Sequence, residues 1–243
     1  MFIIELAGIP IRIENRYAYV ENQCRDYRSS RKDYAFSVSA TEEELIAESK
    51  NENRSFPLDY CESICLYRHI CEILPGYSIF LMHSSVVAVD GVAYAFAAKS
   101  GVGKSTHTAL WLKTIPGARV LNGDKPLFRM NEDGSVTAFG TPWKGKEGWG
   151  INASAPLGGI CFLERGEANA IRKATDDEII TKIAHQLYLR GTRTSVDLQL
   201  QLLDRLVSAV PYYVLSCTVS TEAAQLAYQT MKRSKEEFTH ADR

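Results

Sequence analysis

Residues 96–106 read FAAKSGVGKST, a segment with the glycines, the lysine and the hydroxyl groups of a loop that binds phosphate. Gly101 and Gly103 allow successive backbone N–H groups to curl around a β-phosphate without interference from side chains. Lys104 would bridge the β- and γ-phosphates, and the hydroxyl of Ser105 would hold Mg²⁺. The expected cofactors are therefore ATP and Mg²⁺. The predicted nucleotide-binding residues are Ala98, Ser100, Gly101, Val102, Gly103, Lys104, Ser105 and Thr106.

The first position of this motif departs from the usual pattern, which has glycine where this chain has Ala98. Alanine fits there if its backbone has a negative φ, so we predict a negative φ at Ala98. The alternative is a glycine turn between a strand and a helix that never meets a nucleotide. That alternative explains the glycines but not the Lys104-Ser105 pair that follows them.

A carboxylate is expected on a neighbouring strand, where it would hold the metal ion of a nucleotide. The apolar run RVLNGDKPLF at residues 119–128 places Asp124 at the end of a predicted strand. Asp124 is therefore the candidate metal ligand, together with Ser105, and the candidate acid-base group. The alternative role of Asp124 is to begin the turn before Pro126.

The elements that must position these residues can be predicted from alternation, capping patterns and turns. The Asp90-Gly91 pair indicates a hairpin whose second strand runs directly into the glycine-rich segment. The other expected elements, in chain order, are strands within 2–13, 17–20 and 34–39, helices from Thr41 and from Pro57, a helix at 106–113, a strand at 119–122, a strand in GICFLERG, helices from Thr175 and near 195–210, a strand in YYVLSC and a helix from about Thr221.

This order of mixed strands and helices predicts an α/β nucleotide-binding core. A boundary at Pro75-Gly76 would separate a small strand-rich subdomain with a connecting helix, residues 1–75, from a kinase-like domain, residues 76–243.

Composition limits the partners and the compartment. The formal net charge of -1, with 28 Lys and Arg against 29 Asp and Glu, supplies no global positive field, so we expect neither a nucleic acid nor a membrane partner. No secretory signal is recognised at the N-terminus, which favours the cytoplasm, where the six cysteines would be free thiols. Cys61, Cys65 and His69 share one side of a predicted helix, but a fourth metal ligand is missing, so we interpret them as packing residues.

The motif order resembles a known family. Residues 100–105 (SGVGKS), the hairpin that starts at His83 and the Gly123-Asp124 strand end are similar to the HPr kinase/phosphorylase family and the related ATP-dependent phosphoenolpyruvate carboxykinases. The resemblance covers roughly residues 80–165 and not the first 75. It implies a P-loop core of that type, a homo-oligomer and an active-site role for His83. Without the resemblance, His83 would be interpreted as a core or strand-edge histidine.

The chain also departs from that family, which usually has two adjacent aspartates where this sequence has Asp124-Lys125. A single carboxylate can still hold Mg²⁺ or accept a proton, but a second metal is harder to bind beside a lysine. This substitution counts against both the reverse reaction with inorganic phosphate and carboxykinase chemistry.

Two further segments could contact phosphate. The loop TPWKGKEGWG at residues 141–150 lies where the family has a glycine-rich signature, and its composition suits a mobile lid over anions. Lys144 and Lys146 are candidates for phosphate or acceptor contacts, and Glu147 for orientation; the alternative is a solvated surface loop. Arg165 is a candidate to neutralise the transferring phosphoryl group, with a surface salt bridge as its alternative.

These features together predict an ATP-dependent kinase that transfers the γ-phosphoryl group to an acceptor, with Asp124, His83, Lys104 and Arg165 as its catalytic residues. The family resemblance implies a serine hydroxyl, in a protein, a peptide or free serine. Two alternatives stay open: a module that binds ATP without transferring it, and a carboxykinase-like enzyme.

Overall fold

The computed structural model describes residues 1–50, 56–99 and 101–241, with side chains to residue 232. The chain divides into two compact units. The first contains residues 1–77 and 189–199, and the second contains residues 78–188 and 200–243. The segment 189–199, expected within the second domain, therefore belongs to the first unit.

The first unit contains a small sheet with strand order β1-β2-β3. The alternating segment 2–13 folds into two antiparallel strands because Ala7 and Gly8, with φ of 48° and 75°, form a tight turn between them. Its inward side chains Ile4, Leu6, Ile11 and Ile13 are fully buried. The bounds of the unit's elements are β1 (Phe2–Leu6), β2 (Ile9–Glu14), α1 (Ala18–Gln23), β3 (Phe36–Ser39), α2 (Glu42–Ser49) and α3 (Leu58–Ile73).

The strand predicted at residues 17–20 is wrong, because this segment lies at the start of helix α1. The buried carboxylate of Glu62, on α3, accepts hydrogen bonds from the backbone N–H groups of Arg16 and Tyr17 at 2.5 and 3.0 Å. These N–H groups precede a helix, where backbone donors lack partners within the helix. The group that satisfies them comes from 45 residues further along the chain, so local alternation could not reveal it.

Helices α2 and α3 begin as predicted. Thr41 and Glu44 form a complete capping box at the start of α2, and Pro57 immediately precedes α3. The His69 ring contacts Ser39 O and a Glu44 carboxylate oxygen, each at 2.9 Å, while Cys61 and Cys65 pack as buried side chains. All three candidate ligands therefore take part in packing within this unit.

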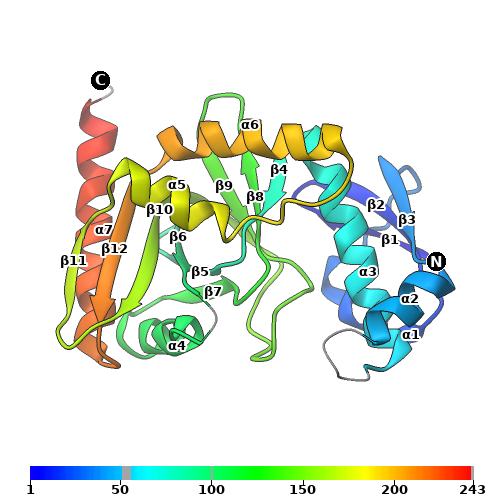
Figure 1. Cartoon of the computed structure of the whole chain (residues 1–243), viewed down its shortest axis with the longest axis horizontal. Coiled ribbons are helices and arrows are strands. Elements are labelled where there is room, and N and C mark those ends of the chain that lie inside the picture. Colours follow the sequence, from blue (N-terminus) through cyan, green and yellow to red (C-terminus); the bar gives the residue numbers. More distant parts are fainter. Residues whose placement is uncertain (51–55, 100, 242–243) are drawn as a thin grey trace. The chain divides into compact units, whose positions relative to one another are not determined.

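The second unit is built on a curled, nine-stranded mixed sheet, which confirms the predicted mixed α/β class (Figure 1). Strand β10 links its two parts: residues 154–156 pair antiparallel with β9, and residues 157–165 pair in parallel with β6 and β12. The strands are β4 (Ile79–Leu81), β5 (Ser85–Val89), β6 (Val92–Ala97), β7 (Arg119–Asn122), β8 (Leu127–Met130), β9 (Val136–Phe139), β10 (Ser154–Arg165), β11 (Ala170–Lys173) and β12 (Tyr212–Cys217).

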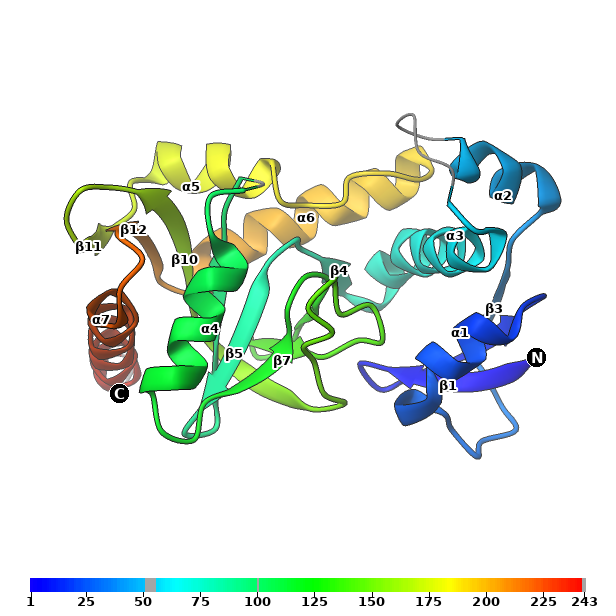
Figure 2. The same cartoon turned by 90° about the horizontal axis from the view of Figure 1, so that it is seen from below.

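Helices cover both faces of the β6-β10-β12 region (Figure 2). One face packs Phe96, Trp111 and Ala227 with α4 and α7, and the other packs Phe162 and Ile183 with α5 and α6. Strands buried on both faces read as continuous apolar runs, as β5 and β6 do. The helices are α4 (Lys104–Thr114), α5 (Asp176–Ala184), α6 (Arg193–Ala209) and α7 (Thr221–Ala241). None of the described helices is long and apolar enough to cross a bilayer.

The sheet topology brings distant segments to one edge. Strands β6 and β10 are parallel, and β5 runs antiparallel to both β6 and β7. The carboxyl ends of β6, β7 and β10 and the amino end of β5 therefore lie along the same edge. Ligands of α/β sheets bind at this edge.

Candidate active site

The glycine loop, residues 98–103, connects β6 to α4 at this edge. Ala98 is not among the described non-glycine residues with positive φ, so its predicted backbone conformation is confirmed. Gly101 and Gly103 have φ of 79° and 126°, which a side chain would strain, and α4 starts at Lys104. Ser100, predicted to bind nucleotide, lies outside the described residues.

The side chains of Lys104 and His83 contact each other next to the glycine loop. Lys104 Nζ lies 2.6 Å from His83 Nε2, and the His83 backbone N–H donates to Gln186 O at 2.7 Å. An ammonium group has only donors, so His83 Nε2 must accept this bond with its lone pair. His83 is therefore a neutral imidazole that holds Lys104 in place.

The charges around this pair support the same assignment. Burial, and then the positive charge of Lys104, lower the pKa of His83, while Asp124 acts in the opposite direction. Burial also lowers the pKa of Lys104, against the attraction of the Asp124 and Glu147 carboxylates. Because lysine starts about four pH units above histidine, the proton stays on Lys104 near neutral pH.

Asp124 lies between the side chains of His83 and Lys125. Its Oδ1 is 3.5 Å from His83 Nε2, and its Oδ2 is 3.8 Å from Lys125 Nζ. The side chain of Asn122 fixes the backbone of this turn, because its Oδ1 accepts from the N–H groups of Asp124 and Lys125 at 2.8 and 2.7 Å. The carboxylate therefore lies between an imidazole and an ammonium group.

Hydrogen bonds anchor both ends of the loop of residues 141–150, and the mobile lid that its composition suggests stays a prediction. Asn122, fully buried, donates to Thr141 O and Trp143 O, and Thr141 Oγ1 donates to Lys125 O. At the other end, the Gly123 N–H donates to Trp149 O. These bonds tie both ends of the loop to the strand that carries Asp124.

Within this loop, Gly145 lies directly against the carboxylate. A Cβ atom added at Gly145 would come 2.8 Å from the Cβ of Asp124. Glu147 is close enough to influence Lys104, whereas the Lys146 side chain is 89% exposed, 3.9 Å from Glu147. Lys144 packs its aliphatic chain near Gly150. The phosphate or acceptor contacts expected of these charged residues stay predictions.

Arg165, at the end of β10, contacts the loop itself. Its guanidinium donates to Gly101 O at 2.6 Å and to Val102 O at 3.4 Å. In this position it supports the loop backbone, and its expected contact with a transferring phosphoryl group stays a prediction.

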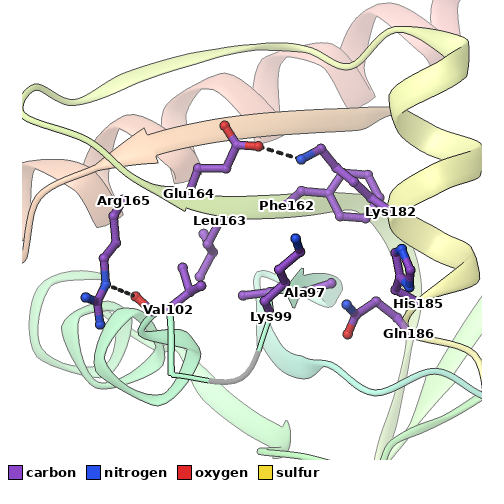
Figure 3. A pocket seen from close by; sticks show the side chains of 11 residues that line it. Ala97, Lys99, Val102, Phe162, Leu163, Glu164, Arg165, Lys182, His185 and Gln186 are labelled. Atoms are coloured by element: carbon purple, nitrogen blue, oxygen red, sulfur yellow. Dashed lines mark hydrogen bonds and ion pairs between the residues drawn. The ribbon is translucent and has the colours of Figure 1, made fainter.

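Two hollows lie next to the glycine loop, and Val102 and Arg165 line both. The first, of about 440 Å³, is also lined by Gly103, Thr106 and the segment 217–219 after β12. The second, of about 340 Å³, is lined by residues from the start of the loop, from the end of β10 and from α5 to Gln186 (Figure 3). The first hollow adjoins the first turn of α4, and the second adjoins the segment that bonds to His83.

The residues present fit Mg²⁺. No cluster of three or more His, Cys, Asp or Glu side chains suited to a metal is found among the described residues. Mg²⁺ is commonly held by one or two protein oxygens together with phosphates and water. Asp124 follows β7 and Ser105 lies in the first turn of α4, and their joint binding of Mg²⁺ stays a prediction.

Sequence reasoning missed Asn122 and Gln186. Asn122 precedes Gly123-Asp124 at the end of a strand, and a buried strand with a terminal amide was the available signal. Gln186 contacts His83 through its backbone oxygen, so no residue type at that position could have indicated the contact.

Comparison with known proteins finds distant structural likeness and no match at the level of sequence. No family model and no curated protein matches this chain. Among solved structures, the HPr(Ser) kinase/phosphatase from Coxiella burnetii is similar with a TM-score of 0.40 and 10% sequence identity. The match covers 67% of this chain and 94% of that chain.

Proposed function

We propose that this protein is an ATP- and Mg²⁺-dependent phosphotransferase that transfers the γ-phosphoryl group to a serine hydroxyl. The observation that carries the proposal is the convergence of Lys104, His83 and Asp124 in front of a glycine loop. Three segments far apart in the sequence supply a cation, a neutral imidazole and a carboxylate, and the imidazole Nε2 lies 2.6 Å from the ammonium nitrogen and 3.5 Å from a carboxylate oxygen. The choice of serine rests on the motif resemblance described above.

The positions of Lys104 and the glycine loop define which end of the nucleotide lies near His83 in this proposal. Lys104 points toward His83, so the γ-phosphate belongs near these side chains, and the β-phosphate belongs at the backbone N–H groups of the glycine loop. The nucleoside must then extend away from Asp124. The first hollow, beside Thr106 and the first turn of α4, offers about 440 Å³ for it.

Transfer requires a base for the acceptor and a cation for the phosphoryl group. Asp124 takes the proton of the hydroxyl as the acceptor oxygen bonds to the γ-phosphorus and the bond to the β,γ-bridging oxygen breaks, with its electron pair leaving on ADP. Lys104 stabilises the charge on the phosphoryl oxygens, and His83 positions Lys104. Mg²⁺, when bound through Ser105 and Asp124, supplies further charge neutralisation.

The test is label transfer from γ-labelled ATP to free serine, serine peptides and small proteins. We expect Asp124→Asn to lower the transfer rate about 10²- to 10⁴-fold, as loss of a general base does. Lys104→Met should abolish transfer, whereas Lys113→Met, which changes an exposed lysine in the last turn of α4, should not. Full activity in Asp124→Asn would remove the proposed mechanism.

One observation favours a second candidate, a nucleotide-sensing module. The Lys125 ammonium lies 3.8 Å from Asp124 Oδ2 and competes with a metal ion or a hydroxyl proton for that carboxylate. A protein that binds ATP, loses this binding in Lys104→Met and never transfers label would be such a module.

A further inference from the structure

The nucleotide placement proposed above leaves the second hollow unoccupied, and this hollow adjoins the segment that bonds to the His83 backbone. It includes Ala98 and Lys99 from the start of the glycine loop and reaches Gln186. The Gln186 carbonyl accepts the backbone N–H of His83, whose ring contacts Lys104. A molecule in this hollow would therefore lie beside the start of the glycine loop and beside the segment that bonds to the His83 backbone.

Arg165 and Val102 are the two residues that line both hollows, and the other lining residues differ. The bonds of Arg165 to Gly101 O and Val102 O hold its side chain against the glycine loop. A nucleotide in the first hollow would thus leave the second hollow open to another molecule. A phosphotransferase needs two such sites, one for the donor and one for the acceptor.

The lining of the second hollow carries excess positive charge. Its charged groups are Lys99, Arg165 and Lys182 against the single carboxylate of Glu164. Lys182 Nζ already pairs with Glu164 at 2.5 Å, and Arg165 is bound to the loop carbonyls. No ion pair joins Lys99 to any other residue that the structure describes. Figure 3 shows its side chain rising from the loop toward β10.

The remaining walls are apolar, formed mainly by Ala97, Val102, Phe162 and Leu163. A volume of about 340 Å³ admits a molecule the size of an amino acid rather than a folded protein surface. Lys99 is an exposed cation that has no ion pair among the described residues, and its position at the edge of an apolar hollow favours a small anion.

We propose, resting on the phosphotransferase function above, that the second hollow is the acceptor site and that the acceptor is a small hydroxy acid whose carboxylate is bound by Lys99. L-serine is the simplest such acceptor. Its hydroxyl oxygen would gain the bond to the γ-phosphorus, its hydroxyl proton would pass to Asp124, and ADP would leave. This proposal restricts the acceptor to a small molecule in which the hydroxyl group lies close to a free carboxylate.

The experiment compares L-serine with L-serinamide, which lacks the carboxylate charge, and with a serine peptide blocked at both ends. We expect kcat/KM for serine to exceed that for serinamide at least about tenfold, because serinamide loses one charge-assisted hydrogen bond. Lys99→Met should raise KM for serine and close this gap to below about threefold, and Lys99→Arg should restore it in part. Lys113→Met is the matched control.

The outcomes separate the two proposals. If the wild-type protein phosphorylates serinamide or the blocked peptide as well as serine, or if Lys99→Met leaves the gap intact, the acceptor site is refuted and the phosphotransferase stands. If no acceptor and no water takes up label in a Lys104-dependent manner, the phosphotransferase fails and the acceptor site with it. Calorimetric binding of serine in the presence of ADP, lost in Lys99→Met, would support the site independently of turnover.

Discussion

Removing the positive charge of Lys104 should raise the pKa of His83. In the structure, Lys104 Nζ donates to His83 Nε2 at 2.6 Å, and protonation of the ring would break this bond and place two cations side by side. A hydrogen bond from a charged donor is worth about 1.5–3 kcal/mol, and this stabilisation of the neutral ring is lost without Lys104. The His83 side chain is 44% exposed, so solvent screening favours the lower figure.

Lys104→Met removes the bond while keeping a side chain of similar length. Burial still lowers the pKa of His83 in this variant, but the attraction of Asp124, 3.5 Å away, is no longer opposed by Lys104. The direction of the change is therefore upward. Lys104→Arg keeps the cation and should leave the pKa of His83 low.

The assay is an NMR titration of the histidine ring protons, with the His83 signal assigned by its loss in His83→Gln. His107 provides an internal reference, because burial alone lowers its pKa to about 4 and its titration should not move. A His83 pKa that stays constant or falls in Lys104→Met would refute the assignment of His83 as the neutral acceptor. The positioning of Lys104 in the proposed mechanism would then lose its basis.

Three further predictions test other parts of the second unit. Between pH 6.5 and 4, His107 becomes protonated in the unfolded chain but stays neutral in the folded protein. The free energy of unfolding should therefore fall by up to about 3 kcal/mol as the pH is lowered over this range. Urea unfolding at both pH values, with His107→Gln as the comparison, checks this. Gly145→Ala and Gly148→Ala should each lose about 1 kcal/mol for positive φ, but only Gly145→Ala displaces Asp124 and should lower label transfer at least about tenfold. Asn122→Asp places a negative charge at a buried site and removes the amide N–H groups that bond to Thr141 O and Trp143 O. The free energy of unfolding should therefore fall by about 3 kcal/mol. An unchanged urea midpoint would contradict the anchoring role of this side chain.

Local elements were predictable where neighbouring residues supply the stabilising group. The capping boxes at Thr41 and Thr175 bond within three residues, and the turn at Asp90-Gly91 needs only two residues that tolerate positive φ. Helix α1 was missed because its first N–H groups bond to Glu62, a residue distant in the sequence. The strand predicted there had local alternation but no partner in the sheet.

The sequence also predicted individual functional groups of the site. The loop motif indicated Lys104, and a strand end indicated Asp124. The apolar character of β5, β6 and β10 also marked these strands as buried. The two hollows, by contrast, each combine residues from three helices or strands and the loops that follow them, and no single segment of the sequence contains a signal for them.

By itself, the sequence determined which chemical groups are present and which backbone turns hold them: the glycines with positive φ, the lysine after them and the carboxylate at the end of a strand. Only the tertiary structure decided that His83 accepts a hydrogen bond from Lys104, that Arg165 supports the loop, and that Lys99 faces a hollow of its own. The physical reason is the sheet topology. Strands β5, β6, β7 and β10 bring their ends to one edge, and the protonation state of a side chain depends on the burial and charges it finds there.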